Sequence, residues 1–205
     1  MSIMLVDVNE VKTFLEIDES ITTFDTLLAN FIKYVSNRIE IYLNRNLKKQ
    51  ERTKYFQTGK RKFFVDAYPI DSTATITVVV DGETQTINDD YFVWHNEGVI
   101  EFDYKTSYIE PKNLYITWSG GYASTGTIIN GTFTDADLLL VDIPDALKFA
   151  CVLQVSYLFR RRKDYGLSSV SMPDGTVSSF GITTGDLLPD VKKILNSFRK
   201  MPNEY

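Results

Sequence analysis

The sequence predicts an α+β fold, in which a helical bundle of about four helices carries an inserted small antiparallel β-sheet and a C-terminal hairpin or arm. Apolar residues recur every three or four positions within 24–43, 144–163 and 186–201, which is the spacing of helices with a buried face. Between residues 52 and 118 the period falls to two and glycine-containing turns interrupt the chain, a pattern typical of antiparallel strands. The strands are therefore expected as an insertion between helices.

A capping pattern and a long apolar stripe predict the first two helices. Asp7, followed three residues later by Glu10, resembles a capping box, so a short helix is expected to begin there and to run to about residue 15. The apolar stripe within 24–43 predicts a second helix, with a hydroxyl group of Thr22 or Thr23 as its N-cap.

Two further helices are predicted near the C-terminal end. Pro144 suits the first turn of a helix, because its fixed φ matches the helix and its missing N–H is not needed there. The helix that it opens, to about residue 163, is apolar on nearly all sides and must be covered on nearly all sides. It is expected to be the central core helix or to meet a neighbouring subunit. The last helix, 186–201, has one apolar face.

Short alternating segments separated by turn residues predict the β-sheet. Asp81-Gly82 tolerates the positive φ of a tight two-residue turn, so the strands on either side are expected to form a hairpin. A second hairpin is expected around residues 96–98, and Gly120-Gly121 is expected to end the last strand. The predicted strands are residues 52–58, 62–65, 75–80, 84–87, 91–95, 99–104 and 114–118.

These elements suggest a division of the chain into domains. We expect a helical core domain from residues 1–50 and 143–205, an inserted antiparallel β domain over 51–122, a projecting loop at 123–142 and a flexible arm at 164–185. Within the loop, residues 127–133 resemble a small hairpin, and 172–176 is a proline- and glycine-containing turn in the arm.

The charge and the cysteine content exclude several classes of protein. A net charge of −5 and a pI of about 5.0 argue against a general nucleic-acid binder, which is usually basic. They allow a ring through whose bore DNA passes, because an acidic wall repels the phosphates and so does not hold the passing DNA. With Cys151 as the single cysteine, no intrachain disulfide or cysteine-based metal cluster can form, and this side chain is expected to be buried.

The sequence carries no targeting signal that we recognise. Its first residues lack the charged segment and the apolar core of a signal peptide, and no run of about 18 apolar residues could span a membrane. We therefore expect a soluble protein that is made in a cytoplasm.

The residues needed for catalysis are scarce, so the chain is predicted not to be an enzyme and to need no cofactor or metal. His95 is the single histidine and Cys151 the single cysteine, so the chain has too few of the ligands that the usual zinc sites need. A histidine-based triad would likewise need partners that the chain does not supply in the usual number. The acidic pairs Asp89/Asp90 and Asp135/Asp137 fall in turns, where aspartate commonly makes local hydrogen bonds. A hydrolase that depends on carboxylates alone is the remaining catalytic alternative.

Charged and apolar residues outside the predicted core are candidates for an interface. The basic run Arg160, Arg161, Arg162 and Lys163 complements the dipole at a helix C-terminus, but four cations in succession exceed that need. An acidic partner surface or DNA phosphates are the second interpretation. The other candidates are arm and loop residues with exposed-looking side chains, which are Tyr165, Val170, Met172, Val177, Phe180, Ile128, Ile129 and Phe133.

Five short segments occur in an order that resembles one protein family. They are IEIYLNR (39–45), YPI (68–70), WSGGY (118–122), IPDAL (143–147) and LPDV (188–191). Their order resembles the head–tail connector (adaptor, or head-completion) proteins of long-tailed bacteriophages. The segment 123–142 is longer than that family leads us to expect, and the β insertion over 52–118 is substantial.

The resemblance implies a structural virion protein at the head–tail interface, assembled in the host cytoplasm. It implies a ring of copies, a dodecamer, beneath the portal, which links the capsid to downstream neck or tail-completion proteins and leaves a channel for double-stranded DNA. We expect no sequence-specific DNA binding and no membrane partner. Residues 164–185 and the last helix are the hypothetical contacts to portal or neighbour. Another morphogenesis role, in tail completion or on the capsid, is the alternative.

Overall fold

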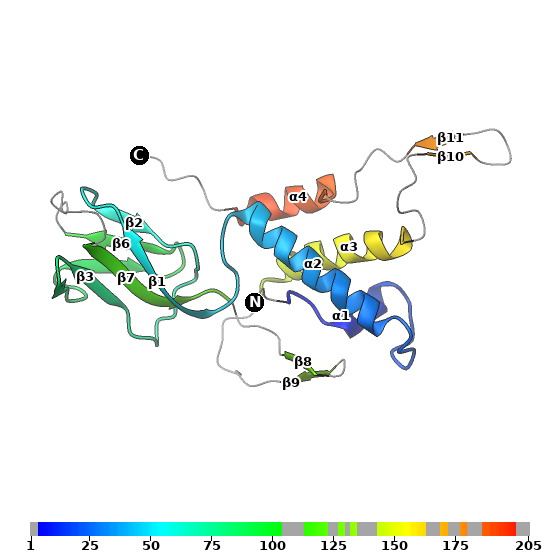
Figure 1. The fold of residues 1–205 in the computed structure, drawn as a ribbon, viewed down its shortest axis with the longest axis horizontal. Coiled ribbons are helices and arrows are strands. Elements are labelled where there is room, and N and C mark those ends of the chain that lie inside the picture. Colours follow the sequence, from blue (N-terminus) through cyan, green and yellow to red (C-terminus); the bar gives the residue numbers. More distant parts are fainter. Residues whose placement is uncertain are drawn as a thin grey trace. The chain divides into compact units, whose positions relative to one another are not determined.

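The computed structural model describes residues 4–103, 113–122, 127–129, 132–134, 143–162, 169–171, 177–179 and 186–199. The chain forms two compact units, of which one holds the four helices and the other holds strands β1 to β7 (Figure 1). The predicted α+β class with four helices is confirmed. The turn at 172–176 lies outside the described residues.

The four helices lie where periodicity predicts them, with shorter ends. They are α1 (Val8–Phe14), α2 (Asp25–Leu43), α3 (Asp145–Arg160) and α4 (Pro189–Asn196). At the end of α3 the N–H of Arg162 bonds to the carbonyl of Phe159, a tighter turn that closes the helix before the predicted residue 163. Pro189, without an N–H, begins α4 three residues later than predicted.

The predicted capping box of α1 is present in full. The carboxylate of Asp7 accepts the N–H of Asn9 at 3.0 Å, and the carboxylate of Glu10 accepts the N–H of Asp7 at 2.8 Å. At α2, Thr22 contacts the first turn through its backbone carbonyl, which accepts the N–H of Asp25 at 3.1 Å. The starts of α1 and of α2 are therefore both fixed by local hydrogen bonds.

Helix α3 is the centre of the helical unit, because it packs against α1, α2 and α4. This confirms the prediction of a core helix covered on nearly all sides. Cys151 is fully buried in it, as expected. The exception is Phe149, which is 49% exposed and meets Phe14 edge to face at 6.4 Å between ring centroids. The other apolar residues of α3 that are buried are Leu147, Ala150, Val152, Val155, Leu158 and Phe159.

The inserted strands form two antiparallel sheets, where the sequence predicts one. They are β1 (Gln50–Phe56), β2 (Lys62–Phe64), β3 (Thr77–Val80), β4 (Glu83–Thr84), β5 (Tyr91–Trp94), β6 (Val99–Phe102) and β7 (Leu114–Gly120). One sheet has the order β1-β7-β3-β4 and the other the order β2-β6-β5. Strand alternation alone does not reveal which strands pair, so the split was not predictable from the pattern.

One hydrophobic core holds both sheets together. Leu114, Ile116 and Trp118 line the inner face of β7, since alternate residues of that strand are buried. They share a cluster with Phe63 of β2 and Ile100 of β6 from the second sheet. Because both sheets turn an apolar face to the same cluster, the β unit is a small sandwich.

Both predicted tight turns are confirmed. Asp81 and Gly82 have φ values of 53° and 85°, as a type I′ hairpin turn between β3 and β4 requires. Gly98 has a φ of 67° between β5 and β6. Gly120 is still part of β7, so the strand continues past the point where its end was predicted.

Two short antiparallel ladders complete the described elements. Strand β8 (Thr127–Ile129) pairs with β9 (Thr132–Thr134), as the hairpin-like sequence there predicts, and β10 (Ser169–Ser171) pairs with β11 (Val177–Ser179). None of the described helices is long and apolar enough to cross a membrane.

Gly120→Ala is expected to destabilise the β unit by about 2 to 4 kcal/mol, because an added Cβ would lie 2.3 Å from the backbone carbonyl oxygen of Ala67. Gly82→Ala is the matched control, since its added Cβ meets nothing within 4 Å and costs only about 1 to 2 kcal/mol from its positive φ. Urea unfolding of the full chain measures both. Equal losses would contradict the steric argument.

Candidate functional site

The residues that most often form catalytic or metal sites have structural roles in the described part of the chain. His95 holds Nδ1 3.1 Å from the carbonyl oxygen of Ile70. Burial raises the pKa of the Cys151 thiol to about 12, so this sulfur stays protonated at neutral pH. No group of three or more potential metal ligands gathers among the described residues. Asp90 accepts the N–H of Thr86 at 2.8 Å, which is the turn role predicted for it.

The basic run at the end of α3 divides into two kinds of residue. Arg161 donates to the hydroxyl of Tyr157 at 2.6 Å, and Arg162 donates to the carbonyl of Phe159 at 2.7 Å. The Arg162 guanidinium also lies 4.0 Å from the centroid of the Phe159 ring and 5.3 Å from that of Phe24, so it packs on the bundle. Arg160 is exposed. Arg161 and Arg162 thus make contacts within the helical unit, whereas Arg160 points to an exposed surface whose role stays a prediction.

Of the other predicted interface residues, Ile128 and Phe133 are brought together as register partners in the β8–β9 ladder. Lys163, Tyr165, Met172 and Phe180 lie outside the described residues, as do Asp135 and Asp137. Ile128, Ile129, Phe133, Val170 and Val177 lie in β8 to β11, whose backbone pairing is described. Their role at an interface stays a prediction.

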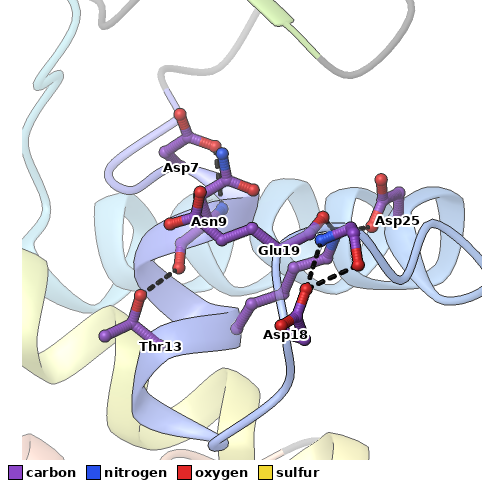
Figure 2. Close-up of polar contacts among 8 residues, drawn as sticks. Asp7, Asn9, Thr13, Asp18, Glu19 and Asp25 are labelled. Carbon is purple, nitrogen blue, oxygen red and sulfur yellow. Dashed lines mark hydrogen bonds and ion pairs between the residues drawn. The ribbon is translucent and has the colours of Figure 1, made fainter.

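A buried lysine, which the sequence did not reveal, ties α1 to α2. Lys12 is 1% exposed, and its Nζ lies 2.5 Å from the carboxylate of Asp25. The same nitrogen donates to the backbone carbonyl of Glu19 at 3.1 Å, in the α1–α2 connection (Figure 2). A buried cation needs such partners to offset the loss of water. The contacts of this lysine are thus those of a structural cation.

Three segments far apart in the sequence meet at one place in the β unit, which we call the junction: residues 45–49, 66–71 and 118–122. Backbone hydrogen bonds join all three. The N–H of Tyr122 donates to Leu47 at 2.6 Å, and that of Gly121 donates to Pro69 at 2.9 Å. A third joins Asn46 to Asp66 at 2.8 Å. The junction contains residues of three of the five segments on which the family resemblance rests.

Arg45 lies at the centre of the junction and is 6% exposed. Its guanidinium carbon is 3.4 Å from the ring centroid of Tyr68 and 5.6 Å from that of Tyr122. One of its terminal nitrogens donates to the backbone carbonyl of Tyr68. The planar cation therefore contacts one aromatic residue from each of the other two segments, an arrangement worth about 2 kcal/mol or more when it is desolvated.

Two residues of the third segment allow the backbones to approach. The indole nitrogen of Trp118, which is fully buried, donates to the carbonyl of Ala67 at 3.0 Å. At Gly121, with a φ of 108°, an added Cβ would lie 2.6 Å from the carbonyl oxygen of Leu47. Only glycine fits both the space and the backbone conformation.

An ion pair closes the edge of the junction. Lys49 lies 2.7 Å from the carboxylate of Asp71, and both side chains are mostly buried. The Lys49 ammonium, helped by hydrogen bonds from Thr73, lowers the pKa of Asp71 from 3.8 to about 2. This carboxylate therefore stays charged at neutral pH and acts as a fixed anchor rather than as a proton donor.

Arg45→Lys is expected to lower the free energy of unfolding by about 1 to 3 kcal/mol, because an ammonium cannot stack as a plane between two tyrosine rings while it donates to the Tyr68 carbonyl. Thermal unfolding measures the loss. Arg160→Lys, at an exposed position, is the control and should leave the stability nearly unchanged. Similar effects of the two substitutions would show that stacking at Arg45 contributes little.

Asp71→Asn tests the ion pair through pH. A carboxyl whose folded pKa is lowered to about 2 stabilises the fold above its ordinary value of 3.8, and that stabilisation is lost as the pH falls through 2. The variant should therefore unfold about 1 to 2 kcal/mol more easily near neutral pH and match the native chain near pH 2. Denaturant unfolding at several pH values gives the curve. A gap that does not change with pH would contradict the assignment.

Comparison with known proteins places this fold in a family. A profile of the family described as head completion protein matches residues 4–201. A search of curated protein sequences finds no match. Among solved structures, a chain from the virion of a native gene transfer agent particle is similar, with 12% identity and a TM-score of 0.57, over 97% of this chain and 91% of that one.

A second similar chain comes from the neck of an empty gene transfer agent particle, computed with C6 symmetry. It has 12% identity, a TM-score of 0.56 and the same coverage of 97% and 91%. At this identity the likeness concerns the fold. The family profile, however, spans both the helical unit and the β unit, and the chain belongs to the head completion protein family.

Proposed function

We propose that this protein is a structural component of a phage-like virion, a head–tail connector that assembles as a ring beneath the portal and links the capsid to the neck and tail. The family match over residues 4–201 carries the proposal. Similarity in fold to a chain of a particle neck, over almost the full length of both chains, supports it.

The chemistry of the described residues agrees with a structural role and with our proposal that the protein is not an enzyme. Several of its buried polar side chains have structural partners, as Arg45 and Lys12 illustrate. Gln154, buried in α3, donates to the carbonyl of Asp186 at 3.3 Å and accepts the N–H of Leu188 at 2.9 Å. This side chain thereby fixes the start of α4. Polar groups that are engaged in this way hold the elements in place.

The proposed partners are further copies of the chain, the portal protein of the same virus and a downstream neck or tail-completion protein. Double-stranded DNA would pass through the ring without sequence-specific contacts, which suits a chain with a net charge of −5. Arg160 to Lys163 and the 164–185 segment with α4 remain our candidates for the contact with portal or neighbour.

Native mass spectrometry of the purified chain, alone and mixed with the portal protein of the same virus, tests the proposal. We expect a complex of defined stoichiometry with the portal, in a multiple that matches the portal ring. A capsid protein from the same virus is the control and should give no complex. A ring from the chain alone would mean that assembly is intrinsic, and a ring only with the portal would mean that it is templated.

A chain that stays folded and monomeric and ignores the portal would contradict the connector function. In that case the same measurement with tail-completion proteins would test the alternative role in morphogenesis.

A further inference from the structure

The charges of the β unit are divided between two parts of its sequence. Every lysine and arginine that the structure describes in this unit lies within residues 45–62. The described residues from 81 to 103 carry only acidic charges, among them Asp81, Glu83 and Asp89, which are exposed. The described part of the unit is thus polarised, although the whole chain has a net charge of only −5; Lys105 and Lys112 of the same unit lie outside the described residues.

The strand order puts these charges at opposite sides of the sandwich. In the four-stranded sheet β1 and β4 are the two edges, and in the three-stranded sheet β2 and β5 are the two edges. Phe56 of β1 and Phe63 of β2 lie 5.7 Å apart between ring centroids, so these two edges lie on the same side. Residues 85–90 connect β4 to β5, with a bridge of Ile87 to Tyr91, and the hydroxyl of Tyr91 donates to the carbonyl of Ile76, just before β3, which is the neighbour of β4. These contacts indicate that β4 and β5 lie on the same side. We call these the basic side (β1 and β2) and the acidic side (β4 and β5).

The basic side keeps a surplus of positive charge after its internal ion pairs are formed. Its described pairs join Lys49 to Asp71 and Lys54 to Asp66, while Arg61 and Lys62 share one carboxylate of the central strand β6. None of these pairs reaches an acid of β4 or of the connection to β5. The described ion pairs therefore do not join the basic side to the acidic side.

Exposed aromatic and aliphatic side chains lie on the same two sides. Tyr55 of β1 is 57% exposed on the basic side. On β5 and the connection before it, Ile87 is 45%, Phe92 40% and Trp94 52% exposed, and the indole nitrogen of Trp94 donates to Glu101 of the central strand β6 at 3.2 Å. These are all the large exposed hydrophobic residues of the described β unit. Aromatic anchors with a charged surround are the usual composition of the centre of a protein interface.

From these observations we propose that the β units of successive copies of this chain dock head to tail, with the basic side of one copy on the acidic side of the next. The occupant is a second copy because one chain carries both complementary surfaces on opposite sides of one rigid sandwich. A head-to-tail contact of that kind builds a closed ring when the rotation between successive copies divides a full turn, and it does not build a two-fold dimer. The inference rests on the proposed connector function for its biological setting and specifies which surfaces form the ring contact.

Exposed open edges also favour this contact geometrically. Strand β1 is a sheet edge with Glu51, Thr53 and Lys54 exposed, and β4 at the other edge has two exposed residues. Such edges have backbone groups that can accept a partner strand, and charged residues on them restrict the partner to one of opposite charge.

Two charge-reversal variants of the full chain test the proposal. The first carries Lys54→Glu and Lys60→Glu on the basic side, and the second carries Glu83→Lys and Asp89→Lys on the acidic side, all at exposed positions. Sedimentation equilibrium at protein concentrations up to about 1 mM and salt of about 50 mM measures self-association. Lys54→Arg with Glu83→Asp is the control that keeps every charge.

Each variant alone should associate at least about tenfold more weakly than the native chain, and an equal mixture of the two should recover within about threefold of it. The mixture should recover because the reversed basic side of the first variant, now acidic, complements the reversed acidic side of the second, now basic. The unchanged sides of the two variants also match, so the two variants alternate along the assembly. Salt of about 500 mM should weaken the native association and leave the control equal to the native chain.

Three results would overturn the proposal: a native chain that remains monomeric over the whole range, variants that associate as the native chain does, or a mixture that gains nothing. If only the basic-side variant lost association, the contact would be between two like sides instead. Portal binding by a monomeric chain would overturn this inference and leave the connector function standing. Charge-dependent self-association without portal binding would support this inference and contradict the connector function.

Discussion

The junction around Arg45 is the constraint on which the rest of the β unit depends. Three segments separated by many residues meet there, and the guanidinium of Arg45 packs with Tyr68 and Tyr122 while backbone hydrogen bonds join Leu47, Pro69 and their partners. A buried cation is costly to desolvate, so it is retained only where rings and carbonyls replace its water. Arg45 lies two residues after the end of α2, so the chain enters the sandwich at its most constrained point.

Much of the fold could be predicted because local patterns determined it. The capping box at Asp7, the stripe of α2 and the Asp81-Gly82 turn are each set by residues close in sequence. The split into two sheets, the burial of Lys12 and the role of Gln154 depend on partners far along the chain, and a single sequence carries no periodic signal for them. The family segments were visible one by one, but their meeting at Arg45 was not.

The candidate interface stays a prediction, and there is a physical reason why a sequence specifies an interface less directly than a fold. A basic run such as Arg160 to Lys163 has the same composition whether it binds a partner or its own helix, and the structure gives Arg161 and Arg162 contacts within the bundle. The separation of basic and acidic charges across the sandwich could not be predicted from the sequence for a different reason. Its charges are separated in sequence by strands that are neutral, and they become two opposed surfaces only when β1 and β4 take opposite edges of one sheet.

The proposed connector function needs rigid parts and surfaces that match between successive copies. The junction supplies a rigid part, and the basic and acidic sides are the proposed matching surfaces. The junction fixes the sandwich, and the sandwich presents its charged sides at fixed separation. An electron cryomicroscopy reconstruction of the neck of the virion tests this account most directly. The account predicts a ring of this chain against the portal, with β1 and β2 of each copy facing β4 and β5 of the next. Density that places the chain on the capsid surface or in the tail tube would contradict it.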